Sequence, residues 1–356
     1  MRVLLPLLPG LGDALTAGPI LDGVARAGGR VDVLAMLGPV AQYARELPVV
    51  DRVTVFDLNA GPLAALMAAV SLRRNRYDLA ILPFPATRWQ YHALTAVVRA
   101  RRVATHDYGG AARALDMMQR ALLVPLEGGH RIAENARLAK RAGFAGELRY
   151  VIPLDWRGKV QRGLLGVHTG TMRYKGNEER RWPIERFIKL IEKSVDSGHQ
   201  VRIFIGPWDS EDEAALTGLR SSQSVEVIRE DIASVARLLS ECEVFVGNDA
   251  GVAHLAAALG VKTVTLFGMT DPIRAQPLGS SVAVRPSLCP PCHDEGMKTF
   301  RCVLHIGYRC TREDLTVESA WHAVERAFLD EPAVFMPHMS GPYRLYGRER
   351  ESSLRG

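Results

Sequence analysis

Residues 243–279 read EVFVGNDAGVAHLAAALGVKTVTLFGMTDPIRAQPLG. A β-branched and aromatic run ends in the turn 248–251, a small-residue helix follows over 252–259, and 263–267 form the next buried strand. Ligands of open parallel sheets bind at the carboxyl ends of the strands, where the first turn of a helix directs backbone N–H groups and its positive end at one place. The stretch therefore predicts an anion site at 248–251, unless it is a strand–helix–strand unit that binds no ligand.

Strand and helix signals alternate over most of the chain, which predicts an α/β protein with parallel, doubly wound sheets. The other predicted strands are 3–8, 31–37, 53–57, 80–84, 103–106, 164–168, 201–205 and 225–228, and the other predicted helices are 14–27, 63–73, 89–99, 130–142, 183–195, 210–219, 232–241 and 314–330. A length of 356 residues suits two domains. Residues 143–162 show glycine, proline and little periodicity, so we expect domains at 1–155 and 163–330 and a basic tail at 331–356.

The composition is that of a globular protein, with 47% hydrophobic and 24% charged residues. A net charge of +6 and an isoelectric point near 9.2 suit a nucleotide-sugar or an anionic membrane surface. No nucleic-acid partner is expected, because aromatic residues make up 7% and no nucleic-acid motif occurs. The chain has no run of about 18 apolar residues that would predict a membrane-spanning helix. Its apolar start is broken by Pro6 and Pro9, which favours a buried strand over a signal peptide. Five cysteines do not make a disulfide scaffold for a chain of this size, so we expect the cytoplasm as the compartment.

A glycine-rich turn follows the first predicted strand and leads through Gly10 and Gly12 to Asp13. These two glycines alone do not make the full dinucleotide-binding pattern. A carboxylate at the carboxyl end of this strand could accept the proton of an acceptor hydroxyl. It could equally act as a helix N-cap, because aspartate at that position bonds the N–H groups of the first turn.

Two motifs resemble those of glycosyltransferase family 9, the ADP-heptose:lipopolysaccharide heptosyltransferases. They are Asp249-x-Gly251-x-x-His254-Leu-Ala-Ala-Ala and Leu266-Phe-Gly-x-Thr270-Asp271-Pro272. The family usually has threonine or serine after the aspartate, where this chain has Ala250, so one hydroxyl that could bond a donor phosphate is missing while the backbone N–H groups remain. The resemblance spans nearly the whole chain and implies the GT-B architecture, in which two tandem Rossmann-like domains have parallel sheets that face a central cleft.

The resemblance implies that the second domain binds a nucleotide-sugar, most plausibly ADP-heptose, and that Asp13 is the catalytic base of the first domain. The expected donor-binding residues are Thr169, Thr171, Arg180, Asp249, Ala250, Gly251 and His254. The family's usual phosphate contact is a basic residue two positions before Trp-Pro, which is Arg180 here, and a solvated charge run is the other interpretation. The two threonines could bond phosphate oxygens or merely turn the chain.

Four cysteines are crowded near the end of the chain, at Cys289, Cys292, Cys302 and Cys310. A CxxC pair with two further thiols is typical of a tetrathiolate metal site, although the second CxxC is absent, and free thiols packed under a loop are the alternative. A heptosyltransferase subgroup that modifies autotransporter proteins has iron on a cysteine cluster in this region, so Zn or Fe is the expected ion. Four thiolates leave no open position, so such an ion would be structural. Catalysis is expected to need no cofactor, because the helix dipole and an arginine can neutralise the departing diphosphate without Mg²⁺.

The sequence thus indicates an inverting glycosyltransferase that moves a sugar to an acceptor hydroxyl, as in lipopolysaccharide biosynthesis. The acceptor could be a glycan, a lipid-linked molecule or a protein, and peripheral association with the inner membrane is compatible with the basic charge. Two alternatives stay open. One is a nucleotide-sugar epimerase or hydrolase of GT-B type, and the other is a non-catalytic, metal-bearing scaffold of the same fold.

Overall fold

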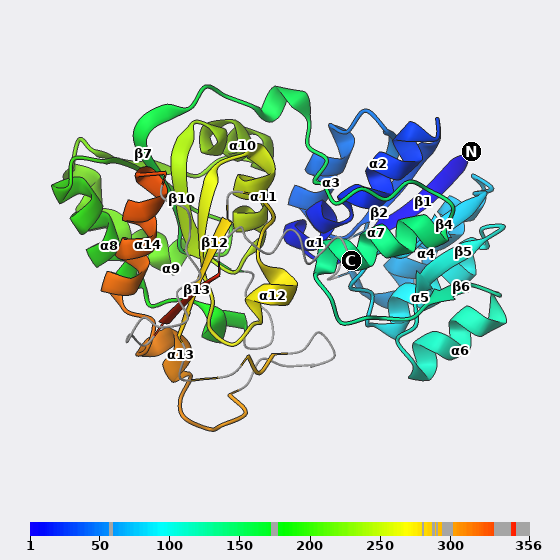
Figure 1. The fold of residues 1–356 in the computed structure, drawn as a ribbon. Coiled ribbons are helices and arrows are strands. Elements are labelled where there is room, and N and C mark those ends of the chain that lie inside the picture. The colour runs from blue at the N-terminus through cyan, green and yellow to red at the C-terminus, as the bar shows by residue number, and fades with distance from the viewer. Residues whose placement is uncertain are drawn as a thin grey trace. The chain divides into compact units, whose positions relative to one another are not determined.

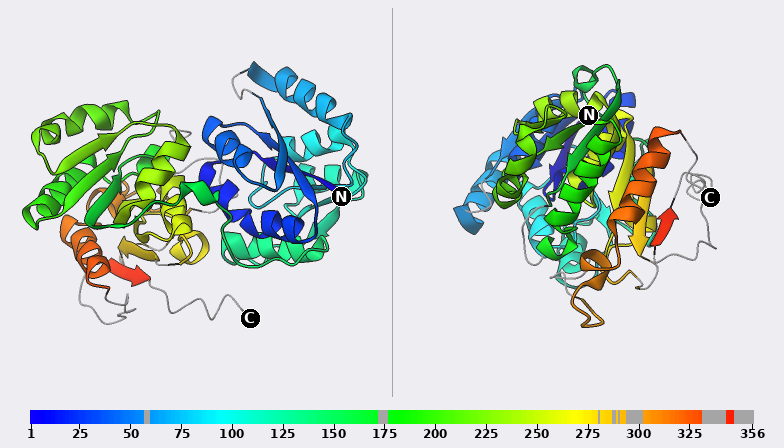
Figure 2. Two further views of the ribbon diagram at one scale, coloured as in Figure 1. Left: turned by 90° about the horizontal axis from the view of Figure 1, so that it is seen from above. Right: turned by 90° about the vertical axis from the view of Figure 1, so that its left-hand side faces the viewer.

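The computed structural model describes residues 1–56, 60–171, 177–279, 281–286, 289, 291–293, 302–330 and 343–346. The chain forms two compact units, Met1–Pro153 and Leu154–Gly356. Each unit contains a parallel sheet with helices packed against it (Figures 1 and 2). The predicted α/β class with two tandem Rossmann-like domains is therefore confirmed.

The first unit contains a six-stranded sheet in the order β3-β2-β1-β4-β5-β6, and every strand pair in it is parallel. Its strands are β1 (Arg2–Leu7), β2 (Arg30–Ala35), β3 (Val50–Val55), β4 (Leu79–Ile81), β5 (Val103–His106) and β6 (Leu122–Val124). Its helices are α1 (Leu11–Thr16), α2 (Gly18–Arg26), α3 (Gly38–Arg45), α4 (Gly61–Arg73), α5 (Trp89–Val98), α6 (Gly110–Met118) and α7 (Arg131–Arg141). The strand order reverses between β1 and β4, which is the point where sheets of this kind bind ligands.

The second unit repeats this order as β9-β8-β7-β10-β11-β12, and β13 is added antiparallel to β12. Its strands are β7 (Gln161–His168), β8 (Gln200–Phe204), β9 (Val225–Ile228), β10 (Cys242–Asn248), β11 (Lys262–Leu266), β12 (Ser281–Pro286) and β13 (Tyr343–Tyr346). Its helices are α8 (Ile184–Asp196), α9 (Ser210–Ala215), α10 (Ile232–Ser240), α11 (Gly251–Leu259), α12 (Pro272–Ala275), α13 (Arg309–Arg312) and α14 (Val317–Phe328), and its 3-10 turns are Leu154–Trp156, Asn177–Arg180 and Leu216–Ser221. The order reverses here between β7 and β10.

Helices cover both faces of the second sheet, with α8 and α14 on one face and α10 and α11 on the other (Figure 1). Leu190 of α8 and Val324 of α14 pack against Val246 and Val264 of the central strands in one fully buried cluster. Burial of each such side chain contributes about 1.5–3 kcal/mol. This packing holds the carboxyl ends of β7, β10 and β11 in fixed positions.

The predicted helix 14–27 is wrong as a single element. The structure has α1 and α2 instead, with a break at Ala17. Pro19 lies in the first turn of α2, where a missing N–H costs nothing, whereas inside one long helix it would remove a hydrogen bond and clash with the preceding turn.

Other boundaries also differ from the predicted ones. The last helix begins at Val317 and not at 314, because the hydroxyl of Thr316 accepts a hydrogen bond from the Ser319 N–H at 3.2 Å and caps it. Residue 57 of a predicted strand lies outside the described residues, as does the predicted tail apart from β13. In the part of the chain that the structure describes, no helix combines the length and the apolar character needed to cross a membrane.

Candidate active site

The turn after β10 is held by Asn248, the last residue of that strand. Its buried amide oxygen accepts a hydrogen bond from the backbone N–H of Trp182 at 2.9 Å, and its amide nitrogen donates to the carbonyl oxygen of Thr169 at 2.6 Å. The ends of β7 and β10 and the segment that leads into α8 therefore meet at one side chain. This junction lies at the strand-order reversal of the second sheet.

Helix α11 begins at this junction with Ala250 as its N-cap and Gly251 as its first residue. Ala250 has extended backbone and no polar side-chain group to satisfy the first-turn N–H groups. His254 lies buried in the same helix, in its first turn. The backbone thus has the form that binding of an anion at 248–251 requires.

Arg180 reaches the same turn from the other side of the junction. Its Nη2 atom donates to the backbone oxygen of Asp249 at 2.7 Å and also pairs with the Asp249 carboxylate. The Arg180 and Asp249 side chains are 14% and 7% exposed, so water screens their attraction only weakly. A guanidinium group is therefore held beside the first turn of α11, where it neutralises Asp249 and could form a fork with a diphosphate.

The neighbouring Arg181 has a different role. Its Nη2 atom donates to carboxylate oxygens of Asp209 and Asp212, each at 2.6 Å. The hydroxyl of Thr169 donates to the same Asp212 oxygen at 2.6 Å, and Thr171 is buried two residues further on. Arg181 and the Thr169 hydroxyl thus join the end of β7 to the start of α9, and Arg180 is the arginine of the pair that contacts the α11 turn.

In the first unit, Asp13 lies in α1, next to the strand-order reversal. One carboxylate oxygen accepts the Gly10 N–H at 3.3 Å, and the other pairs with Nη1 of Arg131 at 3.3 Å. The N-cap interpretation of Asp13 is wrong, because Gly10 is the N-cap and Asp13, at the third helical position, bonds its N–H. Gly12 lies inside α1 between them. The Asp13 side chain is 19% exposed, so it can be reached from solvent.

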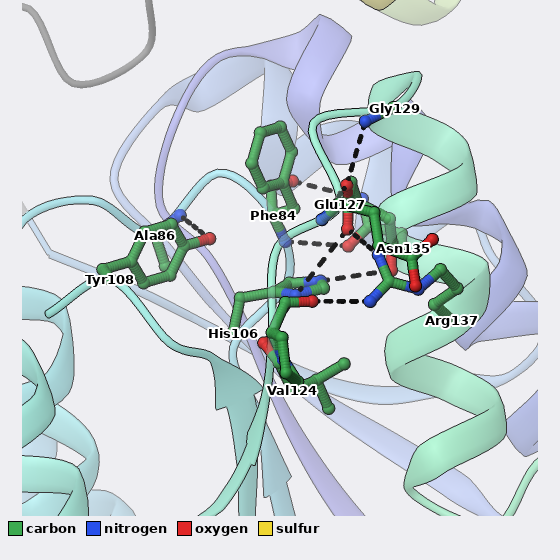
Figure 3. Close-up of polar contacts among 11 residues, drawn as sticks. Phe84, Ala86, His106, Tyr108, Val124, Glu127, Gly129, Asn135 and Arg137 are labelled. Atoms are coloured by element: carbon green, nitrogen blue, oxygen red, sulfur yellow. Dashed lines mark hydrogen bonds and ion pairs between the residues drawn. The ribbon is translucent and has the colours of Figure 1, made fainter.

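Helix α7 holds the carboxyl end of β4 through Asn135 (Figure 3). The buried Asn135 side chain accepts the Phe84 N–H at 2.8 Å and donates to the carbonyl oxygens of Phe84 at 3.1 Å and Thr16 at 3.0 Å. Phe84 follows β4 and Thr16 ends α1. One amide therefore connects α7, the end of β4 and the helix that contains Asp13.

A second set of contacts fixes the loop before α7. The buried carboxylate of Glu134 accepts the N–H groups of Glu127 and Gly129 at 3.1 and 3.2 Å and pairs with Arg137 at 2.5 Å. Nε2 of His106 lies 3.1 Å from the carbonyl oxygen of Glu134, and burial lowers the pKa of the His106 imidazole. These bonds hold the start of α7, from which Arg131 reaches Asp13.

The four late cysteines line one pocket in the second unit. Its other lining residues are Met269, Leu304, Ile306, Tyr308 and Arg309. All four thiols are free, and the Ile306 N–H points at Sγ of Cys302 at 3.4 Å. Burial raises the pKa of Cys310 to about 11; at Cys302 burial acts in the same direction, but backbone N–H groups outweigh it and lower the pKa. Among the described residues, no group of three or more His, Cys, Asp or Glu side chains is arranged to hold a metal ion.

Comparison with known proteins assigns the family. The sequence model of glycosyltransferase family 9 (heptosyltransferase) matches residues 67–298, well over half of the chain. The chain belongs to glycosyltransferase family 9. Lipopolysaccharide heptosyltransferase 3 of Escherichia coli is 24% identical over 225 residues, which cover 59% of this chain and 65% of that protein. Lipopolysaccharide heptosyltransferase 1 of E. coli K12 is 34% identical over 98 residues, which cover 27% of this chain and 30% of that one. The matches thus span less than two thirds of these family 9 relatives.

Solved structures of heptosyltransferases share the GT-B fold of this family 9 chain. E. coli heptosyltransferase WaaC with ADP is 20% identical, with a TM-score of 0.70 over 92% of this chain and 100% of that one. E. coli ADP-heptose lps heptosyltransferase II is 18% identical, with a TM-score of 0.68 over 93% and 99%. The iron-containing glycosyltransferase TibC of enterotoxigenic E. coli is 11% identical, with a TM-score of 0.55 over 92% and 78%.

Several residues that hold the candidate site of this family 9 chain were not predicted from the sequence. Asn248 stands beside Asp249 inside the family motif, and its place at the end of a predicted strand was a usable signal. Arg131 and Asn135 gave no such signal, because their partners Asp13 and Thr16 are 118 and 119 residues away in sequence. Only the folded sheet brings these pairs together.

Proposed function

We propose that the protein is an inverting glycosyltransferase that binds ADP-heptose as its nucleotide-sugar donor in the second unit. The observation that supports this best is the placement of Arg180 and the first turn of α11 at the strand-order reversal, around Asp249. There the helix dipole and the guanidinium act in the same direction on a diphosphate. The family 9 relative WaaC was solved with ADP, which supports the same class of donor.

The chemistry then divides between the two units. Asp13 accepts the proton of the acceptor hydroxyl as its oxygen forms a bond to C1 of the sugar, and the bond from C1 to the diphosphate breaks with release of the nucleoside diphosphate. Arg180 and the N–H groups of α11 stabilise the charge that develops on the leaving group, so we propose that no catalytic cofactor is needed. The acceptor is a glycan, a lipid-linked molecule or a protein, in keeping with a cytoplasmic step of lipopolysaccharide biosynthesis.

A transfer assay separates this proposal from its two alternatives. Incubation with ADP-heptose and an acceptor should release ADP and lengthen the acceptor by one sugar, as seen by mass spectrometry. An epimerase or hydrolase would change or consume the donor without an acceptor. A scaffold would leave both compounds intact.

Arg180→Ala tests the donor site. We expect it to weaken ADP binding by about 1–3 kcal/mol, the range for hydrogen bonds to charged groups, as measured by calorimetry. Arg162→Ala, an exposed arginine of the same unit, is the control and should bind ADP normally. Unchanged affinity in Arg180→Ala would remove Arg180 from the site.

The donor set of the cysteine pocket is that of a structural metal site, although the described side chains are not arranged around an ion. Four thiols from Cys289, Cys292, Cys302 and Cys310 face one space, and soft thiolates favour Zn or Fe. The structural neighbour TibC is described as iron-containing. We propose that the four thiols close around one such ion, which would stabilise the surrounding loops and take no part in sugar transfer.

Helix α4 carries the feature that best fits a membrane surface. Leu63, Leu66, Met67 and Val70 form one stripe with i, i+3, i+4, i+7 spacing, and each is between 45 and 68% exposed. The opposite face of α4 packs on the core through alanines and Leu72. The exposed arginines at 73, 74 and 76 follow directly. An apolar stripe beside basic residues is the pattern of a helix that lies on an anionic membrane, and we propose that α4 docks there.

Vesicle sedimentation tests this docking surface. The protein should bind vesicles that contain phosphatidylglycerol and bind phosphatidylcholine vesicles much less. Leu66→Gln/Met67→Gln should lower binding roughly tenfold or more through lost apolar burial, and Arg73→Gln/Arg74→Gln should lower it only on anionic vesicles. Lys140→Gln, at an exposed position of α7, is the charge control. Equal binding of all variants would show that α4 is not the contact.

A further inference from the structure

His168 is the last residue of β7, at the strand-order reversal of the second sheet. In the parallel register it lies opposite Gly247 of β10, two residues before Asp249. Neighbouring strands are about 4.8 Å apart, so a nucleotide-sugar at the α11 turn is long enough to reach the imidazole. Side chains alternate between the two faces of a strand. Val167 belongs to the core cluster that α8 and α14 cover, so His168 lies on the other face, where α10 and α11 pack (Figure 1).

One hydrogen bond fixes the tautomer of His168. Nδ1 lies 2.8 Å from the carbonyl oxygen of Phe204, and because a carbonyl only accepts, Nδ1 carries the proton and donates. In the neutral ring Nε2 is then a hydrogen-bond acceptor. Among the described residues no group donates to Nε2, although His168 is only 7% exposed, and the atom keeps contact with solvent. Nearly buried polar groups are usually paired, so this nitrogen has the form of a ligand contact.

Two glycines keep the surroundings of this imidazole free of side chains. A Cβ atom at Gly247 would lie 2.9 Å from the carbonyl oxygen of His168, so only glycine fits opposite it. A Cβ atom at Gly206, after β8, would lie 2.7 Å from the Asp209 carboxylate and 3.8 Å from Cε1 of the His168 ring. Neither neighbouring strand therefore contributes a side chain at these positions that would cover the ring.

We propose that His168 is a donor-binding residue whose Nε2 atom accepts a hydrogen bond from a hydroxyl group of the nucleotide-sugar. The inference rests on the donor site proposed above. The diphosphate of a nucleotide-sugar is ionised at neutral pH and offers only acceptors, so it cannot be the partner. Hydroxyls are present in the ribose and in the heptose, which are both attached to the diphosphate. Arg180 thus recognises the phosphate charge, and His168 selects for a sugar ring beside it.

The test is calorimetry on the full chain with a variant that removes only Nε2. Asparagine in His168→Asn keeps an amide N–H near the position of Nδ1, which can still donate to Phe204. ADP-heptose, or both ADP and ADP-heptose, should bind this variant roughly 3- to 10-fold more weakly, the effect of losing one neutral hydrogen bond. Inorganic pyrophosphate should bind it as it binds the wild type, and the melting temperature should change little. His168→Gln, whose amide oxygen reaches the position of Nε2, should recover part of the affinity.

Further probes identify the hydroxyl and separate His168 from Arg180. If the ribose supplies it, 2′-deoxy-ADP or 3′-deoxy-ADP should bind the wild type and His168→Asn equally. If the heptose supplies it, only ADP-heptose should lose affinity in the variant. Arg180→Ala should instead weaken every probe, pyrophosphate included. His199→Asn is the control, because it removes an imidazole just before β8, at the opposite edge of the sheet, and should bind all probes normally.

The outcomes separate this assignment from the function on which it rests. Unchanged affinity of His168→Asn for both ADP and ADP-heptose would overturn the assignment. An equal loss for pyrophosphate would do the same, and so would a loss for ADP that persists with both deoxy nucleotides. A wild type that binds neither ADP nor ADP-heptose would overturn the donor site and this inference with it. A wild type that binds ADP-heptose through His168 but transfers no sugar would overturn the transferase proposal alone.

Discussion

Replacing Asp13 by asparagine should lower kcat by roughly 10²- to 10⁴-fold, the usual effect of losing a general base. Asparagine keeps an oxygen that can accept the Gly10 N–H, so α1 should still begin correctly. What is lost is the carboxylate charge, and with it the site for the proton and the ion pair with Arg131. Because that pair is partly exposed, the melting temperature should fall by only a few degrees. Affinity for ADP should not change, since the proposed donor site lies in the other unit.

Asp22→Asn is the matched control for this variant. Asp22 lies in α2 of the same unit and pairs with Arg26 at 2.8 Å, so it also loses a carboxylate–arginine pair, but away from the strand-order reversal. It should retain the kcat of the wild type. If Asp13→Asn retains turnover and melts much earlier than Asp22→Asn, Asp13 serves the structure of α1 and the base lies elsewhere.

Replacing Asn135 by alanine should have the largest effect on stability. The change would leave three buried backbone groups, the N–H and C=O of Phe84 and the C=O of Thr16, without this partner. Each unsatisfied buried group costs about 1–3 kcal/mol, so the free energy of unfolding of the first unit should fall by about 3 kcal/mol or more. Calorimetry should show the transition of this unit roughly 6–12 °C lower.

Two further variants show whether the amide itself is responsible. Asn135→Asp keeps an acceptor for Phe84 but places a carboxylate against two carbonyl oxygens, so it should destabilise at least as much as alanine. Lys140→Ala changes an exposed position of the same helix and should leave the transition in place. A small effect of both Asn135 variants would mean that water replaces the amide.

Much of the fold could be predicted because strand and helix periodicity is local. The strands 103–106 and 225–228 have the bounds that the apolar runs indicated. The strands β6 and β12 and the helices α3 and α6 were not predicted, and neither was α13, whose four residues make a single turn and are too few to show a helical period. Such elements form only because the rest of the unit supplies their hydrogen bonds and packing.

The site was predictable to the extent that one stretch of chain builds it. The turn 248–251 could be predicted because the strand before it and the helix after it are both recognisable in the sequence. The choice between Arg180 and Arg181 could not be read in this way, because it depends on Asp209 and Asp212, which lie 28 and 31 residues from Arg181. The sequence alone does not distinguish the roles of two adjacent arginines in one loop, because the carboxylates that bind Arg181 come from a distant part of the chain.

Strand β13 affects the tendency of this protein to aggregate, because it covers one edge of the second sheet. It lies antiparallel to β12, with Ala283 opposite Tyr346 and Arg285 opposite Arg344. Without it, β12 would present a row of unpaired N–H and C=O groups along an apolar strand, which is a template for a strand from another chain. Strand β13, from beyond the last helix, thus covers this edge of the sheet. Loss of its four residues would leave β12 as an exposed edge strand that promotes aggregation.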